Sequence, residues 1–233
     1  GASEVLGLEV AGEVAELAAG TDRWQVGDRV VALLPGGGYA EYASVDARHV
    51  LPMPSRLDFV QAAGLPETVF TVWANVFEQG RLASGETLLV HGANSGIGVT
   101  AIEMAKAAGA RVWVTARGPQ KVARALETGA DVAVDAATGN WAETIKANGP
   151  VDVLLDMIGA AYFENNEQVL ATGGRLVISA FLTGNEVRLD LLQVMLKRLT
   201  ITGSTVRARD ANEKARLTRA VYENVWPWIE AGD

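Results

Sequence analysis

A short apolar run that ends in a glycine-rich turn, Glu86–Gly98 (ETLLVHGANSGIG), constrains this chain more than any other stretch. The run predicts a buried strand, and the amphipathic pattern after the turn predicts a helix. Backbone N–H groups at the start of such a helix, together with the positive end of its dipole, form an anion site suited to a pyrophosphate. Ala93, Ser95 and Gly98 occupy the three small positions of a dinucleotide-binding turn, and Gly98 would let the helix pack closely on the strand.

Strand and helix patterns alternate strictly from this turn onward. Runs rich in Val, Ile and Leu that alternate with amphipathic helices predict a parallel sheet with helices on both faces, a doubly wound α/β (Rossmann) architecture. The expected strands are 86–92, 111–116, 131–135, 151–159, 175–181 and 199–206, and the expected helices are 98–109, 120–129, 141–149 and 165–174. Ligands bind at the carboxyl ends of such strands. Here these ends are Gly92–Gly98, Thr115–Arg117, Ile158–Gly159 and Ser179–Leu182.

The chain before this sheet has a different pattern. Residues 7–54 alternate apolar and polar positions between glycine breaks, which predicts short antiparallel or barrel-like strands. We interpret Gly36–Gly38 as a hairpin turn, because a strand pattern over 39–45 follows it and no helix does. Two helical pieces are expected from Asp58 to Gly80, and a last helix over 211–229.

Composition narrows the classes of function. The chain has no cysteine and two histidines, which argues against disulfides and against thiolate- or imidazole-rich metal sites. A net charge of −8 argues against a nucleic-acid surface. No apolar run approaches the roughly 20 residues that span a bilayer, and the first residues do not resemble a signal peptide. We therefore expect a cytoplasmic protein without a metal, a membrane or a nucleic-acid partner.

The end of the second strand indicates which dinucleotide the chain would bind. An NAD site places a carboxylate there, whereas this sequence has Arg117 and Lys121, and a 2'-phosphate would favour two cations. The cations would otherwise oppose the dipole of the helix that begins here. We therefore predict NADPH rather than NADH. The alternative is a solvated helix start with no ligand.

Two further polar residues lie at strand ends. His91 directly precedes the glycine turn, and we predict a structural role for it rather than acid–base catalysis. Asp156 ends a later strand, and we expect it to hold the strand-end loops or a hydroxyl rather than to act as a catalytic base, because hydride transfer needs no general base.

With these residues in view, the chain resembles the zinc-free quinone oxidoreductases of the medium-chain dehydrogenase/reductase superfamily. The motifs that carry the resemblance extend over nearly all of the chain: GLEVAGEVAEL, VGDRVVALLPGGGYAEY, QAAGLPETVFTVW, HGANSGIG, LLDMIGA and GSTVRARD. LLPGGGYAEY and the Ser95–Gly98 turn are most similar to the tumour-suppressor-induced branch. Zinc-dependent relatives have a ligand histidine where this chain has Leu8.

The resemblance implies hydride transfer from NADPH to a quinone or another α,β-unsaturated carbonyl, in a cleft between a Rossmann domain and part of a β-rich GroES-like catalytic domain. The implied domains are 1–66 (GroES-like part and connecting helix), 67–209 (NADPH-binding) and 210–233 (a C-terminal helix leading back towards the catalytic domain). Ser95 is the implied residue on the substrate side. The implied cofactor contacts are Thr71, Asn94, Ser95, Gly96, Ile97, Thr115, Arg117, Lys121, Ile158, Gly159, Ala180, Phe181, Leu182, Thr205 and Val206.

Some features depart from this family pattern. Ala136 stands where relatives often have a tyrosine against the adenosine phosphate, so phosphate recognition would rest more on Arg117 and Lys121. Family members also begin upstream of Gly1 and continue beyond Asp233, and we expect this chain to be a fragment. The apolar strand 199–206 is a plausible sheet edge, and the family commonly pairs this edge across a dimer, so a homodimer is expected.

Three alternatives remain open. A short-chain dehydrogenase has a similar cofactor turn but needs a Tyr-x-x-x-Lys pair, and Tyr162 and Tyr222 are followed at that spacing by Asn166 and Trp226. An enoyl reductase would share the fold and cofactor. An NADPH-binding protein with a structural or regulatory role and little turnover would share them too, because fold does not fix function.

Overall fold

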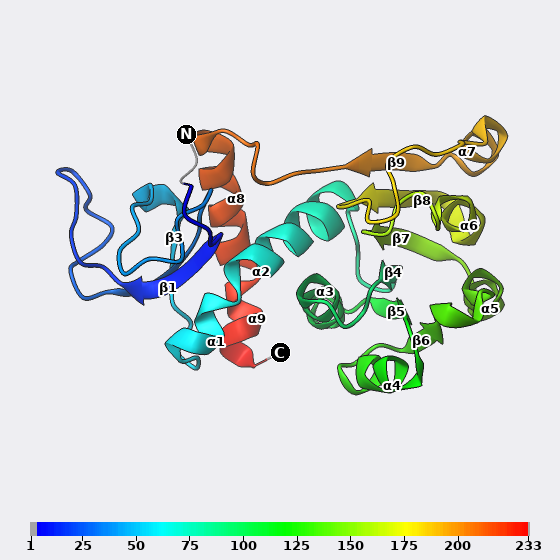
Figure 1. Cartoon of the computed structure of the whole chain (residues 1–233), viewed down its shortest axis with the longest axis horizontal. Helices are drawn as coiled ribbons and strands as arrows, with labels where there is room; N and C mark the ends of the chain where they lie inside the picture. The colour runs from blue at the N-terminus through cyan, green and yellow to red at the C-terminus, as the bar shows by residue number, and fades with distance from the viewer. Residues whose placement is uncertain (1–3, 233) are drawn as a thin grey trace. The chain divides into compact units, whose positions relative to one another are not determined.

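A computed structural model describes residues 4–232, and the chain divides into two compact units (Figure 1). The β-rich unit comprises Gly1–Phe70 together with Val206–Asp233. The α/β unit is the continuous segment Thr71–Thr205. Each unit has its own sheet.

The α/β unit is built on a six-stranded parallel sheet in the order β6-β5-β4-β7-β8-β9. Its strands are β4 Thr87–His91, β5 Arg111–Ala116, β6 Val132–Asp135, β7 Val151–Asp156, β8 Leu170–Ile178 and β9 Thr200–Gly203. The chain runs from β4 out to β6 and then returns to the other side of β4. This order confirms the predicted doubly wound α/β fold, and the reversal beside β4 is where such sheets bind ligands.

Helices cover both faces of this sheet. They are η2 Trp73–Gln79 (a π-helix), α3 Gly96–Ala107, α4 Pro119–Glu127, η3 Ala136–Thr138, α5 Trp141–Asn148, α6 Phe163–Val169 and α7 Leu191–Lys197. Figure 1 shows α3 and α4 on one side of the sheet and α5 and α6 on the other. The core under α5 and α6 is formed by large apolar side chains such as Leu89, Trp113, Trp141, Leu154 and Phe163. No helix among residues 4–232 has both the length and the apolar character needed to cross a bilayer.

The glycine turn has the close packing that its sequence predicts. Ser95 is the N-cap of α3, and its hydroxyl accepts a hydrogen bond from the Gly98 N–H at 3.0 Å. A Cβ atom at Gly98 would meet the Gly92 carbonyl oxygen and would lie 2.7 Å from the Ala93 carbonyl carbon. Only a glycine lets α3 begin this close to the end of β4.

The β-rich unit contains a three-stranded antiparallel sheet in the order β1-β2-β3. Its elements are β1 Glu9–Glu13, β2 Arg29–Leu33, η1 Ala47–His49, β3 Val50–Pro52, α1 Phe59–Ala63, α8 Ala211–Asn224 and α9 Trp226–Ala231. Helix α2 Pro66–Val72 begins in this unit and ends in the α/β unit, because the division falls between Phe70 and Thr71. The N-terminal and C-terminal parts of this unit are tied together. The Ser55 hydroxyl donates to the Glu230 carboxylate at 2.5 Å, and the Trp226 indole N–H donates to the Pro52 carbonyl at 2.8 Å.

The predicted strand over 39–45 is wrong. These residues form no strand, and Tyr39 and Tyr42 are more than three-quarters exposed. The Gly36–Gly38 segment instead lies along the chain before β1, where the Gly38 N–H donates to the Gly7 carbonyl at 2.9 Å. No helix follows the three glycines through residue 46, so they do not form a phosphate loop. Alternation had suggested a buried face that the two tyrosines do not have.

The observed helices also differ from the predicted ones in three ways. The helix expected over 165–174 ends at Val169, and Gly173 and Gly174 belong to β8. Helix α7 was not predicted. The last helix is divided at Val225 into α8 and α9, next to Pro227. Proline cannot donate a hydrogen bond within a helix, which accounts for the division.

Candidate functional site

Four turns meet at the carboxyl edge of the α/β sheet. Parallel pairing aligns His91 with Thr115 and Asp156 with Ile178, so the turns after β4, β5, β7 and β8 start from neighbouring positions. These turns, with the first residues of α3 and α4, carry the predicted site residues except Thr71, Thr115, Thr205 and Val206. Sequence reasoning therefore placed most of its candidates at one edge.

The turn after β4 presents backbone donors. The N–H groups of Gly92 and Ala93 both donate to the Thr115 carbonyl at 3.1 Å, which fixes the turn against β5. Gly96 and Ile97 are the first residues of α3, and N–H groups in a first helical turn have no acceptor within the helix. The Ser95 hydroxyl also donates to the Gly92 carbonyl at 2.9 Å. The predicted substrate-side residue therefore has its hydroxyl engaged in capping α3.

Asn94 has the most unusual environment in this turn. Its side-chain nitrogen and oxygen are both buried, and neither has a hydrogen-bond partner among residues 4–232. A buried amide without partners costs about 1–3 kcal/mol for each unsatisfied group. A ligand that accepts from the nitrogen or donates to the oxygen would remove this cost. The residue lies just before the free N–H groups of α3, so a dinucleotide fits this turn.

The turn after β5 carries two cations. Arg117 and Lys121 are exposed, and neither forms an ion pair within residues 4–232. Gly118 is the N-cap of α4 with φ of 92°, and no side chain caps this helix. The Gly118 N–H donates to the Asp135 carboxylate at 2.9 Å, and this bond helps to hold the pKa of Asp135 below its usual range. Asp135 was not among the predicted site residues, because it lies on β6, whereas the turn that it binds follows β5.

The side chain of Thr115 does not point towards the position predicted for the adenosine phosphate. Its side chain is only 2% exposed, and its hydroxyl lies 2.9 Å from Nδ1 of His91. Thr115 therefore faces the sheet interior, and only the residues after it in the turn extend outward. Strand alternation decides this, because Thr115 points to the same face as the buried Trp113.

The turns after β7 and β8 form one hydrogen-bonded unit. The Ile158 carbonyl accepts from the Thr183 N–H at 2.8 Å, and the Ala160 N–H donates to the Gly184 carbonyl at 3.0 Å. A Cβ atom at Gly159 would lie 2.6 Å from the Gly184 oxygen, so the two turns touch through a glycine. Of the other predicted residues here, Ala180 is half-buried, whereas Phe181 and Leu182 are exposed.

The remaining predicted contacts lie near a buried asparagine. Asn75 in η2 donates from its amide to the Thr71 carbonyl at 2.8 Å and accepts from the Ser204 hydroxyl at 3.0 Å. It thereby joins the segment of Thr71 to the residue before Thr205. Val206 is half-buried and begins the second part of the β-rich unit. From the sequence, Asn75 is only one residue of an expected helix, and nothing in its neighbours indicates this link.

His91 and Asp156 have the structural roles that their sequence positions predict. His91 is fully buried, with Nδ1 beside Thr115 and Nε2 2.8 Å from the Asn166 amide oxygen. Burial lowers the pKa of His91 below 6.5, and the negative charge of Asp156 only partly opposes this. Asp156 accepts from the N–H groups of Ile158 and Gly159 at 2.7 and 3.2 Å. It therefore holds the turn after β7, as predicted.

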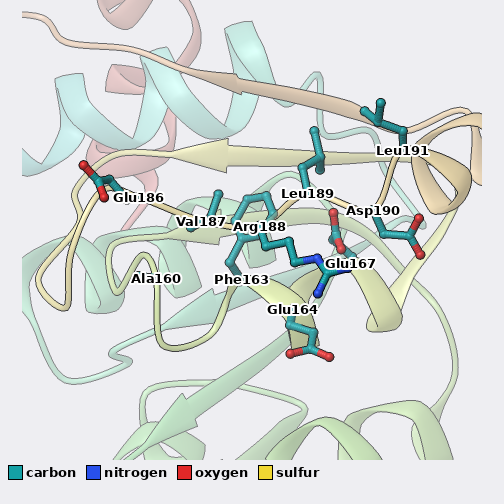
Figure 2. A pocket seen from close by; sticks show the side chains of 10 residues that line it. All are labelled: Ala160, Phe163, Glu164, Glu167, Glu186, Val187, Arg188, Leu189, Asp190 and Leu191. Atoms are coloured by element: carbon teal, nitrogen blue, oxygen red, sulfur yellow. The ribbon is translucent and has the colours of Figure 1, made fainter.

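A separate cavity of about 460 Å³ lies between α6 and the segment that leads to α7 (Figure 2). Four carboxylate side chains and one arginine line it: Glu164, Glu167, Glu186, Asp190 and Arg188. Figure 2 shows Arg188 extending towards the side where Glu164 and Glu167 lie. The excess of negative charge repels phosphate groups. This cavity is therefore unsuited to a dinucleotide, in contrast to the turns around α3 and α4.

Among residues 4–232, no three His, Asp or Glu side chains are grouped so that they could hold a metal ion. The sheet edge instead offers backbone N–H groups at the start of α3 and two cations beside the start of α4, and both suit the phosphate groups of an organic ligand.

Comparison with known proteins places the chain in a family. Residues 96–229 match the family model "Zinc-binding dehydrogenase", and residues 2–55 match "Alcohol dehydrogenase GroES-like domain". The quinone oxidoreductase of Rattus norvegicus is 30% identical over 227 residues, which cover 94% of this chain and 68% of that protein. This chain belongs to the quinone oxidoreductase family of the medium-chain dehydrogenase/reductases. It is an oxidoreductase enzyme of the quinone oxidoreductase type.

Solved structures of this superfamily have the same fold. Escherichia coli quinone oxidoreductase complexed with NADPH has a TM-score of 0.84 at 25% identity, covering 97% of this chain and 71% of that one. CurK enoyl reductase has a TM-score of 0.81 at 26% identity, covering 94% and 67%. This quinone oxidoreductase family member therefore has the superfamily fold.

The buried His91 predicts a pH-dependent stability for this oxidoreductase. Its pKa is lower in the folded chain than in the unfolded chain, so the unfolded state binds the extra proton as the pH falls below 6.5. We expect the wild type to lose more free energy of unfolding than His91→Gln between pH 6.5 and 5.5, by at most about 1 kcal/mol. Urea unfolding at both pH values measures this difference. Equal losses in the two proteins would show that folding does not change the pKa of His91.

Proposed function

We propose that this chain is an NADPH-dependent, zinc-independent reductase that transfers hydride to quinones or related α,β-unsaturated carbonyls. The observation that carries the proposal is the Asn94 amide, buried without a partner beside the first N–H groups of α3. A dinucleotide would satisfy both at once, with its pyrophosphate at the helix start. The nearby Ser95 hydroxyl does not satisfy the Asn94 amide, because it bonds to the Gly92 carbonyl and the Gly98 N–H instead.

The proposed cofactor residues divide by the part of the dinucleotide that each would hold. The bound nicotinamide would supply the hydride for a two-electron reduction of the carbonyl substrate. Asn94, Gly96 and Ile97 would hold the pyrophosphate, with Ser95 fixing their turn. Ile158, Gly159, Ala180, Phe181 and Leu182 would line the cofactor at the later strand ends, and Thr71, Thr205 and Val206 would lie near the nicotinamide.

The preference for NADPH rests on Arg117 and Lys121. Both side chains are exposed, and neither has an ion-pair partner in the described part of the chain. They flank the start of α4, which no side chain caps. A 2'-phosphate would accept charge-assisted hydrogen bonds from both cations and would interact favourably with the helix dipole.

Zinc independence is proposed from the donor chemistry of the chain. It has no cysteine, and the position of the zinc-ligand histidine in metal-dependent relatives is Leu8. Thiolate and imidazole are the groups that hold zinc most often in such enzymes.

An enoyl reductase is the second candidate, and the structural similarity to CurK enoyl reductase favours it. Both candidates require the same cofactor site and the same hydride chemistry. They differ in the substrate carbonyl, which is a quinone in one case and a conjugated acyl group in the other. A binding protein with little turnover is the third possibility.

The test of the proposal is NADPH oxidation, followed by absorbance at 340 nm with a panel of quinones, simple enones and enoyl thioesters, with and without EDTA. We expect oxidation with at least one class of acceptor and no loss of rate in EDTA. Faster reduction of thioesters than of quinones would favour the enoyl reductase. Tight NADPH binding without oxidation of any acceptor would overturn the reductase proposal, and loss of rate in EDTA would overturn zinc independence.

The two cations predict the cofactor preference. Arg117→Ala and Lys121→Ala should each weaken NADPH binding by roughly 10- to 100-fold, which corresponds to about 1.5–3 kcal/mol per charge-assisted bond, and should leave NADH binding nearly unchanged. Fluorescence titration with both dinucleotides measures this. Arg111→Ala is the matched control, because Arg111 is exposed at the opposite end of β5. Equal weakening for both dinucleotides would contradict the assignment.

We also propose that the chain forms a homodimer through β9 and α7. β9 is an edge strand of the sheet, so in the described part of the chain one side of its backbone has no neighbouring strand. Beside it in sequence, α7 exposes Leu191, Leu192, Met195 and Leu196, each by more than half. An unpaired edge next to an apolar helix face is stabilised when a second copy covers both. A two-fold axis would bring the same elements of two copies together.

Disrupting the α7 surface should therefore change the oligomeric state. We expect sedimentation velocity to show a dimer for the wild type and a monomer for Met195→Glu, because a buried unpaired carboxylate would oppose association. Leu126→Glu is the control, since Leu126 is 46% exposed on α4, away from this edge. A monomeric wild type, or a dimer that Met195→Glu leaves intact, would contradict the proposal.

A further inference from the structure

Three polar side chains lie in one row beneath the ligand edge of the α/β sheet. Thr115, His91 and Asp156 stand on the neighbouring strands β5, β4 and β7, each two positions after a residue of the apolar core: Trp113, Leu89 and Leu154. Because side chains alternate along a strand, all three point to the face that α5 and α6 cover. The row is fully buried or nearly so, with exposures of 2%, 0% and 0%.

A fourth side chain, Asn166 of α6, completes the row. It is 0% exposed, and its amide lies between His91 and Asp156. The Asn166 nitrogen donates to the Asp156 Oδ2 at 3.0 Å, and the Asn166 oxygen lies 2.8 Å from Nε2 of His91. Asn166 of α6 thus joins the polar groups of β4 and β7.

The chemistry of these groups fixes every proton in the row. An ionised carboxylate can only accept, so the Asn166 nitrogen must face Asp156 and its oxygen must face His91. Nε2 of His91 must then carry the hydrogen, and Nδ1 accepts from the Thr115 hydroxyl at 2.9 Å. Burial disfavours the charged ring and lowers the pKa of His91. In the neutral ring, reversing the Thr115–His91 bond would leave Nε2 without a hydrogen, so that two acceptors, Nε2 and the Asn166 oxygen, would face each other.

Both ends of the row are attached to the turns of the proposed cofactor site. The Thr115 carbonyl accepts from the N–H groups of Gly92 and Ala93, which precede Asn94. The Asp156 Oδ1 accepts from Ile158 and Gly159. The Asp156 carbonyl accepts from the Ser179 N–H at 2.8 Å. One chain of hydrogen bonds thus connects the turns after β4, β5, β7 and β8.

We propose that Asn166 is a positioning residue of the cofactor site, acting through Asp156 and His91 without touching the cofactor. This inference rests on the proposed function. Asparagine suits the position because it presents a donor to a carboxylate and an acceptor to an imidazole N–H at the same time. Leucine would leave both partners buried and unsatisfied. Aspartate would set a carboxylate against Asp156.

The row of hydrogen-bonded side chains gives the buried His91 a role other than catalysis. His91 transmits the orientation of α6 to Thr115, and thereby to the turn that contains the unpartnered Asn94 amide. Neighbouring apolar rings hold it in place, with Trp141 and Tyr162 each 4.9 Å from its ring centroid and nearly perpendicular to it. A ring that packs against two other rings and forms hydrogen bonds at both nitrogens is held in one orientation.

The first test compares Asn166→Leu with wild type by fluorescence titration of NADPH, well below the melting temperature of each protein. We expect a dissociation constant roughly tenfold or more higher in the variant, because displaced binding groups lose affinity steeply. Asn165→Leu is the matched control, since it makes the same change at the next position of α6, which is only half-buried. A constant within twofold of wild type for folded Asn166→Leu would overturn the proposal.

A second pair of variants tests the other end of the row and does not depend on the folding of Asn166→Leu. Thr115→Val removes the donor to His91 at nearly constant volume, and Thr115→Ser keeps it. We expect Thr115→Val to bind NADPH several-fold more weakly and Thr115→Ser to bind close to wild type. Equal affinities for the two variants would show that the hydroxyl does not matter, which would overturn the role of the row.

The ¹⁵N spectrum of the histidine rings gives a readout that needs no cofactor. The only other histidine is His49, so the signals are readily assigned. We expect His91 to be neutral with its proton on Nε2 in wild type, and to lose this single tautomer in Asn166→Leu. A wild-type proton on Nδ1 would overturn the assigned bonds.

The binding titrations separate this inference from the proposed function. Wild type that binds neither dinucleotide would overturn the proposed function together with the positioning role. Normal wild-type binding with unchanged Asn166→Leu binding would overturn only the positioning role.

Discussion

The pairing of β4 with β5 on one side and β7 on the other is the constraint on which the rest of the α/β unit depends. Both pairs are parallel, so three strand ends and their turns meet at one edge. The chain reaches β7 only after running out to β6 and back, which places segments 60 or more residues apart beside each other. A ligand at this edge can be held by turns that are distant in sequence, and the glycine turn supplies the backbone donors among them.

Placing polar residues at these strand ends has a structural consequence. His91, Thr115 and Asp156 are carried into a face that is otherwise apolar, and each would be destabilising there without partners. Asn166 and the backbone of the turns provide those partners, so the burial of the row and the order of the turns depend on each other. At the opposite edge, Arg175 binds Glu86 with both terminal nitrogens, at 3.0 and 2.6 Å, and fixes the start of β4. The strand is thus fastened at both ends by polar contacts.

Where the sequence patterns failed, packing had decided the outcome. The alternation over 39–45 resembled a strand, but Tyr39 and Tyr42 are exposed and the segment has no strand beside it. Gly173 and Gly174 resembled a helix end, yet they lie in β8, whose pairing with β7 is irregular. Glycine marks such irregularities in strands as well as helix ends, and local sequence cannot separate the two. Helix α7 escaped prediction because its apolar residues are exposed and run into those of the next strand.

The sequence by itself determined the parallel α/β fold, the helix start at Ser95, and the two cations after β5, because these follow from local periodicity, capping and charge. It also determined that His91 and Asp156 stand at strand ends. Only the tertiary structure decided that Thr115 faces inward, that the Asn94 amide is buried without a partner, and that Asn166 joins His91 to Asp156. The physical reason is that a hydrogen bond between buried groups needs both of them at the same point in space. His91 and Asn166 are 75 residues apart, and only the folded sheet and α6 bring them together.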